Sequence, residues 1–390
     1  MEPARTNLVV PLRTLAALFL RLGATSFGGP AVHIALMEEE CVRRRQWLTP
    51  EEFLDLLGAT NLIPGPNSTE LAIHLGHRVA GWRGLVVAGA CFILPAALIV
   101  GLLAWAYVTW GKLPPVAGIL YGVKPVVIAV VVQALWKLGR TCLKTWPLAV
   151  LTVAAIVLTA LGVHELLVLF GAGTLWALGQ VPRLPPRPHD ATTTPALLLP
   201  ALALAPGAAA STAVPLGLGP LFFFFVKIGS VLFGSGYVLL AFLRADLVER
   251  YRWLTERQLL DAIAIGQVTP GPVFTTATFI GYLLCGPAGA VVATLGIFLP
   301  AFLFVALSVP LLPRLRRSTV ASAFLDAVNA ASLALMAVVT WQLSFAAVVD
   351  LPTALLAVVS AVLLLGFRVN ATWLVVGGAV VGLGKVLVLG

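Results

Sequence analysis

The sequence predicts an all-α polytopic membrane protein made of two inverted six-helix repeats with broken helices. The first observation is composition: of 390 residues, 60% are hydrophobic and 11% are charged, whereas soluble proteins carry about 25% charged residues. The second is that long uncharged runs follow one another from end to end, as in helical membrane proteins. The third is an internal duplication. The alternating strands of roughly ten residues that a transmembrane β-barrel needs are absent.

Charge and cysteine usage narrow the class further. The net charge of +9 is explained by basic cytoplasmic loops, with a general bias toward anions as the alternative. The segment 1–13 is short and polar and lacks a small-residue cleavage site, so no removable signal peptide is expected. Because the four cysteines are scattered without a CxxC pair, we expect no metal site, disulfide framework or cofactor.

The duplication shows in motifs that recur at a nearly fixed spacing. Pro64-Gly65-Pro66 returns as Pro270-Gly271-Pro272, an offset of 270 − 64 = 206. FG and WLT motifs repeat at the same offset, and downstream pairs such as Gly84 and Gly289 differ by 289 − 84 = 205. A slip of one residue over so long a stretch indicates a duplicated chain. The predicted units are an N-terminal repeat over 1–181, a linker over 182–217 and a C-terminal repeat over 218–390.

Each repeat contains six apolar segments that we expect to be helical. In the first half they fall at about 12–37, 50–80, 84–110, 115–138, 146–161 and 165–181; in the second at about 218–243, 256–285, 287–312, 320–343, 351–367 and 371–389. The first segment of each half is interrupted by a glycine-rich FGGP or FGSG motif, and the second by Pro-Gly-Pro. Thr49, followed by Pro50 and two acids, predicts the start of the second segment.

Basic residues in short loops predict the orientation. In each matching pair of loops after segments two to five, one half has a basic loop where the other does not, which indicates opposite insertion. The N-terminus is then cytoplasmic, and the apolar stretch 195–219 of the linker must cross, giving about thirteen spans and an external C-terminus. The loop holding Arg43, Arg44 and Arg45 departs from this scheme. The alternative is about twelve spans in parallel repeats, with 191–217 as a surface linker.

The two Pro-Gly-Pro breaks are the candidate functional sites. Proline removes backbone donors and glycine lets the chain turn, so such a break survives in a membrane only when it is buried in protein or lines a cavity. Each break starts a new half-helix whose free N–H groups and positive end attract an anion. Local capping of the half-helix is the alternative role for the nearby polar groups. The predicted binding residues are Asn61, Pro64, Gly65, Pro66, Asn67, Ser68, Thr69, Gln267, Gly271, Thr275 and Thr276.

Cations inside apolar segments extend this prediction. Arg21 and Lys227 occupy equivalent positions in the first segment of each half, where a basic side chain usually faces a cavity. The alternative is that each one snorkels toward the headgroups. Lys124 in the fourth segment is a secondary candidate for anion contact. Glycines in the first break let the backbone approach a ligand or another helix, and the positions proposed here are Gly28, Gly29, Gly234 and Ser235.

Glu70 is a candidate for proton coupling, because a carboxyl at membrane depth can titrate; its alternative role is to pair with a cation such as Arg21. Asp55 and Asp261 recur in both halves near a helix start, where compensation of the helix dipole is expected. His33 and His74 are expected to be structural.

The duplicated FGGP/FGSG, WLT and PGP motifs, in a chain of this length, resemble the chromate ion transporter (CHR) family in its long two-repeat form. The resemblance covers about 12–181 and 218–389. It implies chromate export from the cytoplasm by a secondary mechanism that uses the proton-motive force, chromate resistance, and sulfate as the similar competitor. The implied location is the cytoplasmic membrane of a bacterium.

The residues alone leave several alternatives open. Another oxyanion, sulfate above all, is the alternative substrate, and a non-transporting membrane sensor or enzyme is the alternative class. No GxSxG elbow, P-loop or GxGxxG after a strand is found, so the protein is predicted not to be an enzyme. The expected partners are the anion and membrane lipid, with no nucleic acid. The oligomeric state stays open, with a homodimer as one option.

Overall fold

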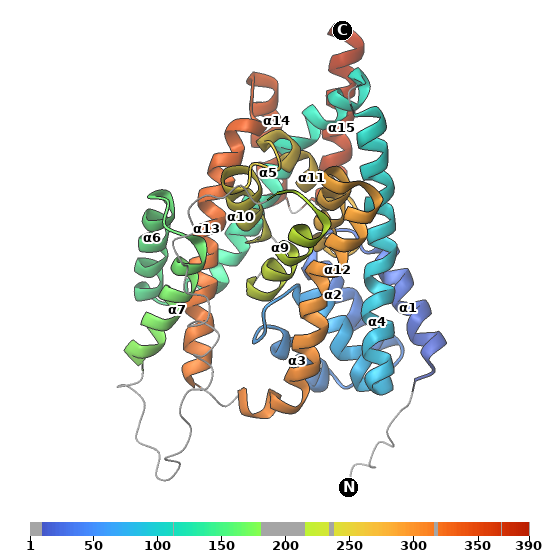
Figure 1. The fold of residues 1–390 in the computed structure, drawn as a ribbon, viewed down its shortest axis with the longest axis vertical. Helices are drawn as coiled ribbons and strands as arrows, with labels where there is room; N and C mark the ends of the chain where they lie inside the picture. Colours follow the sequence, from blue (N-terminus) through green and yellow to red (C-terminus); the bar gives the residue numbers. More distant parts are fainter. Residues whose placement is uncertain are drawn as a thin grey trace.

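The structure, a computed structural model, describes residues 10–111, 113–180, 215–233, 238–315, 319–367 and 369–389. Over these residues all regular structure is helical, which confirms the predicted all-α fold. Figure 1 shows an elongated bundle in which α4 (Asn67–Trp110) and α13 (Thr319–Ala347) run along the long axis. Most of the linker, including the predicted crossing at 195–219 as far as residue 214, lies outside the described residues.

The first segment of each half folds back on itself. In the first half, α1 (Leu12–Thr25) is followed by α2 (Pro30–Glu38) and a π-helical segment (Glu39–Arg44). A straight helix would place Arg21 and Glu40 about 28 Å apart, yet their side chains form an ion pair of 2.7 Å between Nη2 and Oε1. The chain therefore reverses at residues 26–29.

The second half repeats this reversal. Here α9 (Leu218–Val231) precedes α10 (Leu239–Leu243) and the π-helical segment Arg244–Arg250. Lys227 Nζ lies 2.9 Å from Asp246 Oδ2, again across a separation that a straight helix would make about 28 Å. The two halves therefore share a re-entrant first pair.

The second segment also reverses. α3 (Pro50–Thr60) begins with the capping box of Thr49 and Glu52, which confirms the predicted helix start. Arg78, near the end of the next helical leg, forms a 2.5 Å ion pair with Glu52 at the start of α3. A straight path would separate them by about 39 Å, so the chain turns back at the Pro-Gly-Pro break.

The matching part of the second half is built alike. It consists of α11 (Glu256–Val268), which has its own Thr255–Gln258 capping box, a short 3₁₀ turn (Val273–Thr275) and α12 (Thr276–Leu315). Gly266, before the break, lies directly against the side chain of Thr276, after it. The interrupted segments were expected to cross the membrane. In the described residues they instead fold back on themselves, and the Pro-Gly-Pro breaks lie at the tips.

Long helices α4 and α12 each contain a sharp turn. Ala80 and Gly81 have non-helical dihedral angles, and Gly81 has a positive φ of 62°. The two legs of α4 then pack so closely that Gly76 and Gly84 touch each other's backbone carbonyl. Gly281 and Gly289 repeat this contact in α12. The turn lies where the sequence predicted the boundary between the second and third segments, and small residues at the contact let the legs approach.

The remaining helices exchange partners between the halves. α5 (Pro114–Cys142) packs against α14 (Leu351–Leu365) and α15 (Ala371–Leu389) of the other half. In the same way, α13 packs against α6 (Trp146–Ala160) and α7 (Glu165–Gln180), as Figure 1 shows. The halves are therefore interlocked and not side by side.

The second leg of α4 packs against the second leg of α12, with the early part of one beside the late part of the other. Leu85, early in the second leg of α4, clusters with Ala301 and Val305, which lie late in the second leg of α12. Gly89, one turn further along α4, lies directly against the ring of Phe302 in α12. The outer surface is apolar, since Leu98 and Leu102 are about two-thirds exposed, and five of the described helices are long and apolar enough to cross a membrane. The chain is thus an integral membrane protein by its surface as well as its composition.

Candidate functional site

The tips of the re-entrant pairs meet across the two halves. The backbone N–H of Gly65 donates to the carbonyl oxygen of Leu232 at 2.7 Å, and the N–H of Gly271 donates to the carbonyl oxygen of Ser26 at 3.0 Å. Each Pro-Gly-Pro tip therefore binds the first break of the opposite half. Gly65 and Gly271 have φ values of 140° and 85°, conformations that favour glycine. The structure thus brings both predicted breaks to one central crossing.

The first-half tip opens onto the start of α4. No side chain caps this helix, so its first amides, at Asn67 and Ser68, have no intrahelical acceptor. The side-chain amide of Asn67 donates to Asn61 Oδ1 at 2.8 Å, which closes the base of the loop. Pro64 and Pro66 frame the tip. The positive end of a helix with free N–H groups suits an oxyanion.

His33 on α2 links the two breaks of the first half, because it contacts Ser26 beside the first break and Ser68 beside the second. Its Nε2 lies 3.1 Å from the carbonyl oxygen of Ser26, and its Nδ1 lies 3.3 Å from Ser68 Oγ. The ring is buried and packs edge-on against Phe92. The sequence analysis expected a structural histidine here, and the structure places it in contact with a predicted binding residue. The equivalent residue in the second half, 206 positions later, is Leu239. This difference between the two halves was the one feature of the sequence that could have indicated a functional histidine.

Several buried polar atoms at this crossing have no hydrogen-bond partner within the described part of the chain. They are Ser26 Oγ, Thr69 Oγ1, both carboxyl oxygens of Glu70, and Gln267 Nε2. Glu70 is fully buried, and its carboxyl lies so close to Gly65 that a Cβ there would clash with it. Unpaired buried polar atoms are costly, so a polar ligand at this place would satisfy groups that the protein leaves unsatisfied.

The second-half tip is much less polar. The positions that match Ser26, His33 and Ser68 are Leu232, Leu239 and Phe274, all buried. The hydroxyls of Thr275 and Thr276 donate to the carbonyl oxygens of Pro272 and Val273, both at 2.8 Å. Both hydroxyl hydrogens are therefore bonded within the tip and are not free to bind a ligand. Gly234 and Ser235 lie outside the described residues.

The paired cations Arg21 and Lys227 lie on α1 and α9 and are held by acids of the linking segments. Arg21 is half-exposed and shares Glu40 with Arg44 and Arg45, whose contacts are 3.2 and 3.3 Å. Burial works to raise the pKa of Glu40, but hydrogen bonds from Arg21 and Arg45 outweigh it and hold the pKa below its ordinary value. Three arginines around one buried acid leave a local excess of positive charge.

The side chain of Lys227 is less exposed to solvent than that of Arg21. Besides its contact with Asp246, it lines an open recess of about 460 Å³ whose other walls are mainly aromatic, from Phe223, Phe224, Tyr251 and Trp253. Lys124 lies elsewhere, on α5, where it is nearly buried and contacts Asp261 of α11 at 2.8 Å. Over the described residues, the ion pairs of both lysines are with these acids and not with the two tips, so their charge reaches the crossing only through space.

Comparison with known proteins identifies the family. A family model described as "Chromate transporter" matches residues 13–177 and again 219–383, once in each half. The chain belongs to the chromate transporter family. A chromate transport protein of Cupriavidus metallidurans is 36% identical over 95% of this chain and 92% of its own length. No solved structure matches the chain.

Two further relatives agree with this assignment. A probable chromate transport protein of Synechococcus elongatus is 33% identical over 90% of this chain and 88% of its own length. A chromate transport protein of Pseudomonas aeruginosa is 34% identical, with 85% and 80% covered. The family resemblance predicted from the duplicated motifs is confirmed, and membership points to a membrane transporter.

Proposed function

We propose that this protein exports chromate from the cytoplasm by secondary transport driven by the proton-motive force and so confers chromate resistance. The observation that carries the proposal is the polar first-half tip, where helix amides, hydroxyls and His33 converge beside a buried carboxyl in a member of this family. The names of the three relatives above support chromate as the substrate.

The anion occupies the space between residues 65–69 and residues 271–276. A tetrahedral dianion offers oxygens on all sides, and the start of α4 offers amides and the hydroxyls of Ser68 and Thr69 on one side. The glycine breaks at Gly28 and Gly29, whose φ values are 112° and 80°, allow a close backbone approach. Gly271 and the apolar second-half tip form the facing wall. Arg21 and Lys227 contribute positive charge at longer range.

Glu70 supplies the proton-coupling step. As a carboxylate it would repel a bound dianion and be costly at this depth, whereas the protonated acid can donate a hydrogen bond to an oxyanion. Binding of the anion and protonation of Glu70 therefore favour each other, so one proton accompanies the dianion. The pair keeps a net negative charge, and the electrical part of the proton-motive force, negative inside, drives it outward.

The topology that fits this function has inverted halves. The antiparallel packing of the second legs of α4 and α12 supports it, and so does the position of the start of α1 and the end of α15 toward opposite ends of the molecule (Figure 1). Because the first two segments of each half are re-entrant, we count four crossings in each half and one in the linker, about nine instead of thirteen. The odd total keeps the N-terminus cytoplasmic and the C-terminus outside.

The predicted units 1–181, 182–217 and 218–390 are retained in this topology. Alternating access comes from rocking one half against the other around the crossing of the tips. Lipid covers the apolar outer surface, and a homodimer stays a prediction. Sulfate has the same shape and charge as chromate, and nothing in the first-half tip favours one of them, so sulfate is the second candidate substrate.

Chromate flux in proteoliposomes that contain only this protein tests the proposal. We expect movement that responds to an imposed membrane potential and pH gradient and that sulfate reduces by competition. Ser68→Ala should lower the flux about tenfold, the effect of one hydrogen bond to a charged group. Ser344→Ala is the matched control, since that hydroxyl bonds only to its own helix at Trp341. Chromate binding without flux would contradict transport and favour the sensor hypothesis.

A further inference from the structure

A buried ion pair joins the two halves away from the tips. Lys124 of α5 and Asp261 of α11 lie 2.8 Å apart, and their side chains are 10% and 2% exposed. Tyr107 of α4 donates its hydroxyl to the other oxygen of Asp261 at 2.8 Å. Three elements thus converge on one carboxylate.

The scaffold does not require this triad. The position that matches Asp261 is Asp55, which is exposed, and the position that matches Lys124 is Asn329. The duplicated half therefore carries no such triad at these positions. Because removing two charges from water costs more than their attraction commonly returns, a buried pair is weak evidence for a stabilising role. A contribution to stability therefore does not explain why Lys124 and Asp261 are buried together.

The contact between the two charges is poorly directed. Although Lys124 Nζ is 2.8 Å from Asp261 Oδ1, that oxygen accepts no hydrogen bond of normal geometry, whereas Oδ2 accepts one from Tyr107. The ammonium is therefore held mainly by Coulomb attraction. An ammonium group has three donors on a flexible stem, and it can exchange one anionic partner for another without losing a fitted hydrogen bond.

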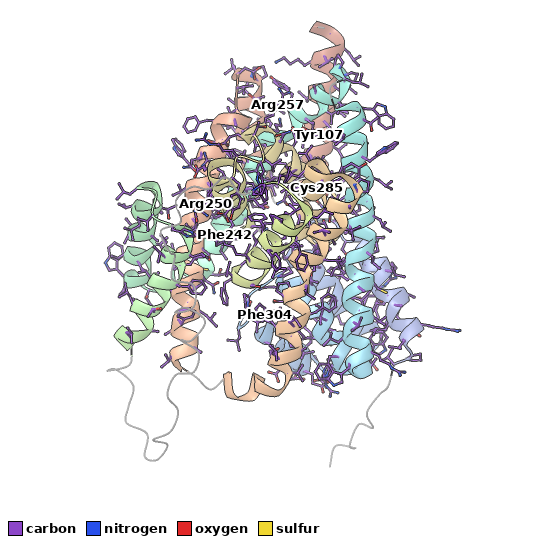
Figure 2. The ribbon with its side chains drawn as sticks, viewed as in Figure 1. Tyr107, Phe242, Arg250, Arg257, Cys285 and Phe304 are labelled. Atoms are coloured by element: carbon purple, nitrogen blue, oxygen red, sulfur yellow. The ribbon has the colours of Figure 1, made fainter. Side chains whose placement is uncertain are left out.

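The triad is connected along the chain to the second-half tip. Asp261 lies seven residues, about 10 Å of helix, before the end of α11 at Val268, and the tip residue Gly271 follows three residues later. Figure 2 shows Tyr107 and Arg257 toward the upper end of the bundle and Phe304 in its lower half. Through α11 and the second-half tip, the triad is joined to the crossing where the anion is proposed to bind.

We infer that Lys124 is a second oxyanion position on the transport path and that Asp261 occupies it here as an internal anion. The transported anion replaces the Asp261 carboxylate on Lys124 and is displaced in turn when Asp261 returns. During the exchange Asp261 keeps the hydrogen bond from the hydroxyl of Tyr107. Arg257 is near enough to act electrostatically on that tyrosine. This inference rests on the proposed transport of an oxyanion.

Three variants test the exchange: Asp261→Asn, Lys124→Gln and the double variant. The readouts are the chromate concentration that gives half-maximal thermal stabilisation of the purified protein in detergent, and the KM of chromate flux in proteoliposomes. Without its internal competitor, Asp261→Asn should bind chromate about tenfold more tightly, and Lys124→Gln should bind it about tenfold more weakly. The double variant has no buried charge to compensate, yet it should bind as weakly as Lys124→Gln.

The chain offers a matched control in a second Lys–Asp–Tyr cluster. Lys385 and Tyr121 donate to Asp350 at 2.8 and 2.6 Å, but this cluster is partly exposed and caps α14. Asp350→Asn keeps a good capping residue and removes the same charge, so it should leave chromate binding unchanged.

A static bridge gives a different pattern. Both single variants would then lose thermal stability, the double variant would regain it, and none would shift the half-maximal chromate concentration; that pattern overturns the exchange. Absence of chromate flux in the unsubstituted protein overturns the proposed function instead. In that event the shifts in the detergent assay still decide whether Lys124 is an anion position.

Discussion

The backbone amide of Gly65 donates a 2.7 Å hydrogen bond to the carbonyl oxygen of Leu232, and the matching Gly271 donates to Ser26. Each tip is therefore hydrogen-bonded to the opposite half as well as held within its own. A movement of one half displaces both tips together, and the polar groups near Ser68 lie where the two halves meet. This arrangement supports the proposal of a single central anion site with coupled access from both sides.

Gly65→Ala should abolish transport and lower the amount of folded protein. The residue has a φ of 140°, and the new Cβ would clash with the Glu70 carboxyl. The backbone strain alone costs about 1–3 kcal/mol. The measurement is chromate flux normalised to folded protein after size-exclusion chromatography.

Gly81→Ala is the matched control for that change. Gly81 also has a positive φ, of 62°, but an added Cβ would meet no atom within 4 Å. We expect a modest loss of thermal stability with flux retained. Equal loss of flux in both variants would show that backbone strain, and not the crowded tip, explains the effect.

His33→Leu introduces the residue that the second half has at this position. The variant loses the contacts of the ring with Ser68 and with the Ser26 carbonyl, while an apolar side chain still fills the buried site. Chromate flux should fall about tenfold or more, since a hydrogen-bond link beside a charged ligand is removed. His77→Gln, at a histidine that packs edge-on against Trp82, should keep normal flux. Normal flux in His33→Leu would remove His33 from the site.

Glu70→Gln should uncouple chromate movement from the pH gradient. The amide mimics the protonated acid and cannot release a proton, so binding at the tip persists while its pH dependence is lost. Flux driven by membrane potential alone should remain measurable. The measurement is chromate flux at several pH values, and a pH profile identical to that of the unsubstituted protein would assign proton coupling to another group.

Arg21→Ala should reduce flux with little change in protein abundance. Glu40 keeps Arg44 and Arg45 as partners, so the acid is not left unpaired, but the local excess of positive charge is reduced. Because salt screens this charge, the difference in flux between the variant and the unsubstituted protein should become smaller at high salt. Arg43→Ala, at an exposed arginine paired with Glu38, serves as the control. Unchanged flux in Arg21→Ala at low salt would contradict the predicted role.

The sequence predicted the elements well, because their signals are local. The capping box at Thr49, the two Pro-Gly-Pro breaks and the turn near Gly81 depend on neighbouring residues. The direction of the chain after each break could not be predicted. Two prolines interrupt a helix, but only contacts between distant residues, such as Arg78 with Glu52, decide that it reverses.

The same limit applies to the candidate site. Ser68 and Glu70 were predicted from the break itself, but the contact of His33 with Ser68 spans 35 positions and depends on the fold. Arg21 carried a signal as a cation in an apolar segment, and its partner Glu40 is adjacent only because α1 and α2 fold back. Local chemistry identified the tips, and long-range packing determined what surrounds them.

Protection of a thiol at position 68 by chromate would show directly that the anion binds at the first-half tip. Ser68→Cys and, as the matched position in the other half, Phe274→Cys are made in a background with Cys41, Cys91, Cys142 and Cys285 replaced. We predict that chromate slows the reaction of residue 68 with a hydrophilic thiol reagent and leaves residue 274 unaffected. A rate at residue 68 that chromate does not change, in protein that still transports chromate, would contradict the placement of the anion at the first-half tip.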